Sequence, residues 1–195
     1  MLTDKLATYT LILASGSPRR HKFLRDMGLD FKIETHPVEE IYPKNLKLEA
    51  ITNYLAKLKA SPFKEKLVPK QIVVTSDTIV WHNKQSLGKP VDKNEAIKML
   101  QTLSNDWHKV ITSICFTTLQ KQKVVHCVTK VRFKKLTDEE IRYYVENYNP
   151  LDKAGAYGIQ EWIGAIGITK IKGPYNNVVG LPTHLFYKTL LDIVS

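Results

Sequence analysis

The chain has 195 residues, enough for one substantial domain or two small lobes. Hydrophobic residues make up 43% and charged residues 25%, as in ordinary soluble globular proteins, and two cysteines argue against a disulfide framework. Because no long apolar run and no apolar N-terminal stretch is present, we expect neither a membrane span nor a signal peptide. With so few cysteines, the reducing cytoplasm is the expected setting. The net charge of +10 favours phosphorylated ligands or nucleic acid as partners.

Strand and helix patterns are mixed along the chain. Hydrophobic patterns predict strands at 11–14, from 31 to 33, and at 72–74, 107–119 and 124–133, and residues 79–81 are expected to continue extended after 75–78. Helices are expected at 19–27, 46–60, 92–103, 137–148 and 182–194, two of them opened by capping boxes. Residues 154–174 are expected to be extended and rich in glycine. These elements predict an α/β fold, and the hairpin at 107–133 favours a mixed sheet.

The most informative segment runs from Ser15 to Arg20, where a short apolar strand leads into Ser-Gly-Ser-Pro-Arg-Arg. Pro18 suits the first turn of a helix and Ser17 its N-cap. The helix N-terminus and the guanidinium groups of Arg19 and Arg20 would together attract phosphate. Each charge-assisted hydrogen bond contributes roughly 1.5–3 kcal/mol, so the arginines should outweigh the helix dipole. The segment predicts a phosphate-binding corner, with an ordinary helix start as the alternative.

Asp77 is the main candidate for an acid, a base or a metal ligand. It follows an apolar strand, where open α/β sheets hold their ligands, and a carboxylate there can hold a divalent ion or accept a proton from water. Glu40 is a second candidate metal or water ligand. Lys59 lies beside the apolar stripe of its helix, and Lys89 is held within a Gly-Lys-Pro triplet. Each of these four side chains has an ordinary turn or surface role as its alternative.

Gln160 closes the segment 152–160, whose glycines and small residues allow another group to approach the backbone closely. Its amide oxygen can accept from N3–H of thymine or uracil and its NH2 group can donate to O4, whereas a carboxylate would only accept. An exposed polar residue is the alternative. The chain has neither a P-loop nor a dinucleotide-binding motif, and its histidines and cysteines lack metal-ligand spacing.

Together these segments resemble the Maf family of nucleotide pyrophosphatases. The resemblance rests on 15–20, 38–40, 55–60, 76–78, 88–90, 152–160 and 175–182, which occur in family order. It implies a single domain over residues 1–195, with an elongated central mixed sheet flanked by helices and two lobes around a cleft. It also implies hydrolysis of a nucleoside triphosphate to the monophosphate and pyrophosphate with a divalent metal cation, Mg²⁺, Mn²⁺ or Co²⁺. A homodimer is implied as well, and neither a membrane nor nucleic acid is expected as a partner.

The resemblance assigns roles to individual residues. Asp77 matches the family's proton acceptor, which would take a proton from the attacking water, and Glu40 and Asp77 are the expected metal ligands. Arg19, Thr78 and Gln160 match the positions associated with substrate choice, and this set resembles the branch acting on dTTP and UTP. Other matched substrate-binding positions are Ser17, Arg20, Lys59 and Lys89. Two alternatives stay open: a pyrophosphatase acting on 7-methyl-GTP or another modified nucleotide, and a non-enzymatic septum-inhibiting or nucleic-acid-binding regulator.

Overall fold

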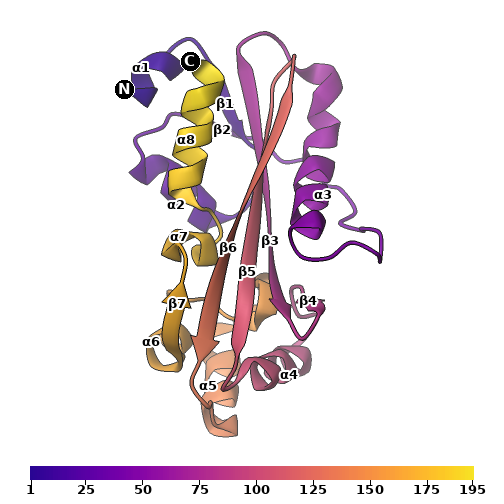
Figure 1. Ribbon diagram of the computed structural model, residues 1–195, viewed down its shortest axis with the longest axis vertical. Helices are drawn as coiled ribbons and strands as arrows, with labels where there is room; N and C mark the ends of the chain where they lie inside the picture. The colour runs from indigo at the N-terminus through magenta and orange to yellow at the C-terminus, as the bar shows by residue number, and fades with distance from the viewer. The chain divides into compact units, whose positions relative to one another are not determined.

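The computed structural model describes all 195 residues, and they form a seven-stranded mixed sheet with helices packed on it (Figure 1). The strands run in the order β2-β1-β3-β5-β6-β7, and β4 pairs with β3 outside this path. Strand β1 is parallel to β2 and β3, whereas the β3–β4 and β6–β7 pairs are antiparallel. The predicted α/β class and mixed sheet are therefore confirmed. The strands are β1 (Thr10–Leu13), β2 (Lys32–Ile33), β3 (Gln71–His82), β4 (Gln85–Leu87), β5 (Trp107–Thr117), β6 (Gln122–Phe133) and β7 (Ile168–Lys172).

Eight α-helices and three short 3₁₀ helices connect the strands. The α-helices are α1 (Leu2–Leu6), α2 (Pro18–Asp26), α3 (Glu49–Ala60), α4 (Lys93–Leu103), α5 (Asp138–Tyr148), α6 (Trp162–Gly167), α7 (Tyr175–Val179) and α8 (Thr183–Val194). The 3₁₀ helices are η1 (Ser61–Lys66), η2 (Pro150–Asp152) and η3 (Ala154–Ala156). No helix combines the length and the apolar character needed to cross a membrane.

The predicted helix ends are confirmed where local chemistry determines them. The Asp92 side chain accepts a hydrogen bond from the backbone N–H of Glu95 at 2.7 Å, which caps α4. At the start of α5, Thr137 and Glu140 form the reciprocal pair of a capping box. Gly28 follows α2 with a φ of +68°, the left-handed conformation in which glycine avoids strain.

The expectation of an extended segment at 154–174 is confirmed only at β7 and was wrong for the part that forms η3 and α6. Its glycines serve close packing inside a folded segment. A Cβ on Gly164 would lie 2.0 Å from the carbonyl oxygen of Ile159, so no larger residue fits this turn of α6. Two other differences are smaller. Helix α3 begins at Glu49 because the preceding Leu48 has a positive φ of 52°, and the short helix α1 was not expected.

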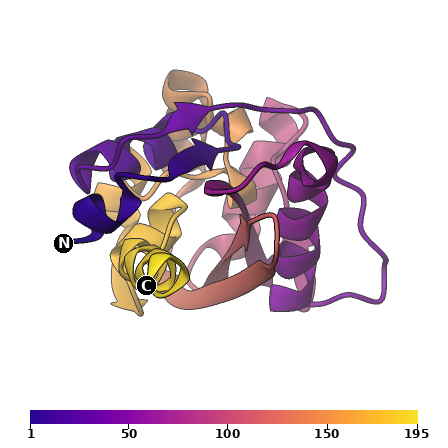
Figure 2. The ribbon, with the colours of Figure 1, turned by 90° about the horizontal axis from the view of Figure 1, so that it is seen from above.

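The chain divides into two compact units. Unit 1 contains residues 1–77, 112–127 and 180–195, and unit 2 contains residues 78–111 and 128–179. In unit 1, α8 and α3 cover opposite faces of the sheet (Figure 2). Neighbouring residues of β5 show this: Phe116 packs against Phe186 of α8, whereas Cys115 packs against Ala56 and Ala60 of α3. The expected cleft and the single domain over 1–195 stay predictions.

Candidate active site

The segment from Ser15 to Arg20 forms the expected corner in unit 1. Strand β1 ends at Leu13, and α2 begins at Pro18 with Ser17 as its N-cap, in the extended conformation that a cap requires. The Ser17 side chain makes no capping hydrogen bond, and its backbone N–H donates to Oγ of Ser15 at 3.3 Å. The N-cap side chain therefore does not itself cap α2.

Arg20 joins this corner to two other segments of unit 1. Its Nε donates to the carbonyl oxygen of Gly180 at 3.0 Å, and its Nη1 donates to the carbonyl oxygen of Ser76 at 2.9 Å and to Oγ of Ser15 at 3.3 Å. Burial lowers the pKa of the Arg20 guanidinium to about 10, and the nearby negative charge of Asp77 partly opposes that shift. The guanidinium thus holds the corner against the middle of β3.

Lys59 brings the two predicted acidic residues together. Its Nζ on α3 lies 2.7 Å from Oδ1 of Asp77 on β3 and 3.0 Å from Oε2 of Glu40. The Asp77 side chain is only 8% exposed, whereas that of Glu40 is 49% exposed. The second oxygen of Asp77, Oδ2, is buried and has no hydrogen-bond partner. A buried carboxylate oxygen without a donor is unusual in a folded protein and needs a chemical reason.

A buried hydrogen bond explains how α3 places Lys59 against Asp77. The hydroxyl of Thr75 donates to the carbonyl oxygen of Ala56 at 2.6 Å. Thr75 and Asp77 lie two residues apart on β3 and so share a face, while Ala56 and Lys59 are neighbours on the surface of α3. Sequence reasoning missed Thr75 and Ala56. The spacing of Thr75 from Asp77 on the strand and of Ala56 from Lys59 on the helix was nevertheless visible in the sequence.

Asp77 and Glu40 fit a divalent metal ion only if the ion has further ligands from outside the chain. No group of three or more His, Cys, Asp or Glu side chains is arranged to hold a metal ion. The orphaned Oδ2 of Asp77 offers one buried acceptor, and the exposed carboxylate of Glu40 offers another. Magnesium is commonly held by one or two carboxylates, with phosphate oxygens and water completing the octahedron.

Thr78, Lys89 and Gln160, the other predicted site residues, belong to unit 2. Thr78 is half-buried on β3, and Lys89 and Gln160 are exposed. The segments that carry Lys89 and Gln160 are joined, because the N–H of Gly155 donates to the carbonyl oxygen of Gly88 at 3.0 Å. Gly155 has a φ of +69°, so this junction favours glycine.

Tyr144 of α5 fixes the segment on both sides of Gln160. Its hydroxyl accepts a hydrogen bond from the backbone N–H of Gly158 at 2.9 Å and donates one to the carboxylate of Glu161. Glu161 also pairs with Nζ of Lys153 at 3.1 Å. Burial, together with the hydrogen bond to Glu161, raises the pKa of the Tyr144 hydroxyl. Sequence reasoning missed this residue because it looked like one more apolar position of α5.

The comparisons with known proteins cover nearly the whole chain. The family description "Maf-like protein" matches residues 10–193. A "dTTP/UTP pyrophosphatase" of Flavobacterium johnsoniae is 55% identical over 194 residues, which is 100% of both chains. Another protein of that name, from Flavobacterium psychrophilum, is 54% identical over 192 residues and 98% of each chain. A solved nucleoside-triphosphatase / dITP/XTP pyrophosphatase from Mycobacterium abscessus aligns at 12% identity with a TM-score of 0.43, over 95% of this chain and 94% of that one. From the family match and the sequence identities, this chain belongs to the Maf family.

Proposed function

We propose that this chain hydrolyses dTTP and UTP to the nucleoside monophosphate and pyrophosphate, with the help of a divalent metal cation. The observation that carries the proposal is the Asp77 carboxylate, which is buried, held through Oδ1 by Lys59 and left without a partner at Oδ2. Relatives that are 54–55% identical over nearly their whole length carry the name dTTP/UTP pyrophosphatase, which supports this choice of substrate.

Asp77 acts in the proposal as the proton acceptor for the attacking water. The contact with Lys59 fixes the orientation of the carboxylate, so Oδ2 can accept a hydrogen bond from a water molecule. Removal of a proton from that water as it attacks the α-phosphorus would contribute about 10²–10⁴-fold in rate. The remaining acceleration would come from positioning and electrostatics, as in phosphoryl transfer generally.

Asp77 and Glu40 are the residues that would hold the divalent ion, together with substrate oxygens and water. When bound, such an ion supplies Lewis-acid stabilisation of the charge on phosphoryl oxygens. Lys59 lies within 3.0 Å of both carboxylates and supplies one positive charge against two negative ones. Arg20 also acts electrostatically on Asp77 and Glu40, so binding of the ion would depend on coordination by the carboxylates, water and substrate oxygens rather than on a net negative charge.

The phosphate chain would be bound by residues that offer positive charge or N–H groups. Ser17 and Arg19 lie at the start of α2, where the positive end of the helix dipole favours anions. Lys59 and Lys89 would offset the charge of the departing pyrophosphate. Arg20 stays in the proposed substrate-binding set, but its hydrogen bonds to two backbone carbonyls support a role in positioning Ser15 and Ser76.

Thr78 and Gln160 are the proposed residues of base selection, together with Arg19. The Gln160 amide can donate to O4 and accept from N3–H of a pyrimidine, and this pairing favours thymine and uracil over guanine-like bases. A single methyl group is worth only about 1–3 kcal/mol in discrimination, so dTTP and UTP should be used with similar efficiency.

A panel of nucleoside triphosphates, assayed with Mg²⁺, Mn²⁺ and Co²⁺ for wild-type protein and Asp77→Asn, tests the proposal. We expect dTTP and UTP to be the best substrates, pyrophosphate to be released, and the variant to be inactive but folded. Preferred hydrolysis of 7-methyl-GTP would contradict the choice of base. Full turnover by Asp77→Asn would remove Asp77 from its role, and a lack of turnover with every metal would favour the non-enzymatic regulator.

A further inference from the structure

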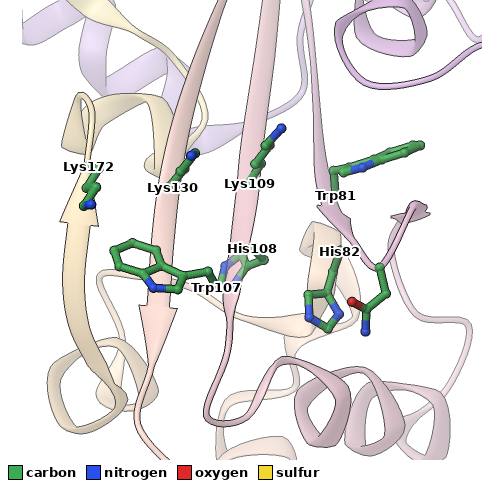
Figure 3. A pocket seen from close by; sticks show the side chains of 8 residues that line it. Trp81, His82, Trp107, His108, Lys109, Lys130 and Lys172 are labelled. Atoms are coloured by element: carbon green, nitrogen blue, oxygen red, sulfur yellow. The ribbon is translucent and has the colours of Figure 1, made fainter.

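Unit 2 carries a pocket of about 410 Å³ on its sheet. Figure 3 shows Lys172, Lys130, Lys109 and Trp81 in a row across the neighbouring strands β7, β6, β5 and β3. Trp107 also lines this pocket. None of these five residues belongs to the proposed catalytic or substrate-binding set.

The alternation of side chains along β5 shows on which face of the sheet Trp107 and Lys109 lie. His108 points into the interior of unit 2, where its Nε2 lies 2.7 Å from the hydroxyl of Tyr157 and its ring stacks on Phe133. Its neighbours Trp107 and Lys109 therefore project from the other face. Both are only half-buried. Trp107 and Lys109 thus lie on the face of β5 opposite the core of unit 2, and His82 and His108 also line the pocket.

The cations on this face stand opposite one another without acidic partners. In the antiparallel register of β6 and β7, Lys130 pairs with Lys172, and Arg132 pairs with Lys170. Like charges directly opposite each other destabilise a strand pair. None of these four side chains forms an ion pair with a carboxylate. An anionic ligand that spans the strands would neutralise charge that the fold itself leaves uncompensated.

Two tryptophans narrow the chemical class of that ligand. Trp81 and Trp107 are half-buried in the same pocket, and Nζ of Lys172 lies 5.3 Å from the ring centroid of Trp107. A phosphate group alone would need the cations but not the aromatic rings. Bases of a single strand stack on aromatic side chains while its phosphates follow lysines and arginines, and this combination is typical of sheets that bind single-stranded nucleic acid.

We propose that this face of unit 2, defined by Trp81, Trp107, Lys109, Lys130 and Lys172, binds single-stranded nucleic acid. Bases stack on the tryptophans, and backbone phosphates contact the lysines, with Arg132 and Lys170 extending the basic surface. Sequence reasoning found no interleaving of basic and aromatic residues and expected no nucleic-acid partner. Basic and aromatic side chains come together only because the strands β3, β5, β6 and β7 lie side by side in the sheet. The proposal does not depend on the pyrophosphatase activity.

The test is binding of short fluorescent single-stranded DNA and RNA oligonucleotides of mixed sequence to the full chain, followed by anisotropy over a series of salt concentrations. Lys130→Gln combined with Lys172→Gln should weaken binding about ten-fold and reduce the slope of log affinity against log salt by about 1.4, because each phosphate contact contributes about 0.7 to that slope. Trp81→Leu and Trp107→Leu should each weaken binding about ten-fold or more through lost stacking.

A matched control is Lys93→Gln combined with Lys98→Gln, which removes the same charge from exposed positions of α4. It should leave the affinity and the salt slope close to those of the wild type. The Lys130/Lys172 variant should unfold at no lower temperature than the wild type, since two opposed charges are gone. Preferential binding of DNA or of RNA identifies the natural strand.

Three results would overturn the proposal. The first is an equal loss of affinity in both lysine pairs, which would mean that net charge alone attracts the oligonucleotide. The second is unchanged binding in both tryptophan variants together with full competition by inorganic tripolyphosphate, which would indicate a simple anion site. The third is the absence of salt-dependent binding by the wild-type chain.

Discussion

Nζ of Lys59 lies 2.7 Å from Oδ1 of Asp77, and this contact leaves Oδ2 of the same carboxylate buried without a partner. The buried hydrogen bond between Thr75 and Ala56 sets the contact by holding α3 against β3. A single lysine therefore orients the carboxylate that the proposed chemistry needs.

Lys59→Met should impair both folding and catalysis. Without the ammonium group, the largely buried carboxylate of Asp77 loses its partner, and we expect a decrease of about 1–3 kcal/mol in the free energy of unfolding. The rate of dTTP hydrolysis should fall about 10²-fold or more, because the carboxylate is no longer oriented. Denaturant unfolding and kcat/KM measure the two effects. Lys57→Met, at an exposed position of the same helix, should change neither.

Arg19 and Arg20 should respond differently to replacement by lysine. Arg20→Lys removes the planar fork that reaches two carbonyls and a hydroxyl, so we expect a loss of about 1–3 kcal/mol in stability. Arg19→Lys should act mainly on catalysis and raise the KM for dTTP, because Arg19 is a proposed substrate-binding residue. Thermal unfolding and steady-state kinetics separate the two outcomes. Equal destabilisation by both substitutions would contradict the division of roles.

Gln160→Glu tests the proposed reading of the base. The carboxylate cannot donate to O4 of thymine or uracil, so kcat/KM for dTTP and UTP should fall about 10²-fold or more, since sites that hydrogen-bond a substrate discriminate strongly. The residue is exposed, and thermal stability should not change. The measurement is kcat/KM for dTTP, UTP, GTP and 7-methyl-GTP. An unchanged order of substrates would show that Gln160 does not select the base.

Tyr144→Phe tests whether the segment around Gln160 must be held in place. The variant removes the acceptor of the Gly158 N–H group and the donor to Glu161, at a cost of about 1–3 kcal/mol in stability. KM for dTTP should rise more than kcat falls, because binding rather than chemistry depends on this segment. Tyr143→Phe, its exposed neighbour, is the control. A fall in kcat alone would argue against this positioning role.

His108 should make the protein less stable in mild acid. Burial lowers the pKa of its imidazole from 6.5 to about 3, although the charge of Asp106 opposes the shift. Since the unfolded chain binds the proton and the folded one does not, stability falls as the pH drops below about 6.5, by at most about 1.4 kcal/mol per pH unit.

The measurement for His108 is denaturant unfolding at several pH values between about 6.5 and 4. His108→Gln, which can still hydrogen-bond to Tyr157, should flatten the dependence of stability on pH. His126→Gln, at an exposed position, should not. A wild-type stability that is constant over this range would contradict the assignment.

Features set by neighbouring residues could be predicted from the sequence. The caps at Asp92 and Thr137, the turn at Gly28 and the start of α2 at Pro18 each depend on a few adjacent side chains, and all four are present. The individual candidates Lys59, Asp77 and Glu40 were also recognisable. Their arrangement was not, because it depends on the packing of α3 on β3 across 18 residues of sequence.

Features set by tertiary contacts escaped the sequence analysis. Arg20 looked like a phosphate-binding residue, but its hydrogen bonds to Gly180 and Ser76 depend on segments distant in sequence. Gly164 suggested extended chain, whereas it lies in α6 against the backbone of Ile159. The basic face of unit 2 arises from strand register, which a pattern of single residues does not contain.

In the proposed reaction, water attacks the α-phosphorus of dTTP while Asp77 accepts a proton from that water. Hydrolysis in water enriched in oxygen-18, followed by mass spectrometry of the products, tests it most directly. We expect one labelled oxygen in dTMP, unlabelled pyrophosphate, and no product with Asp77→Asn. Label in the pyrophosphate, or release of dTDP and inorganic phosphate, would contradict it.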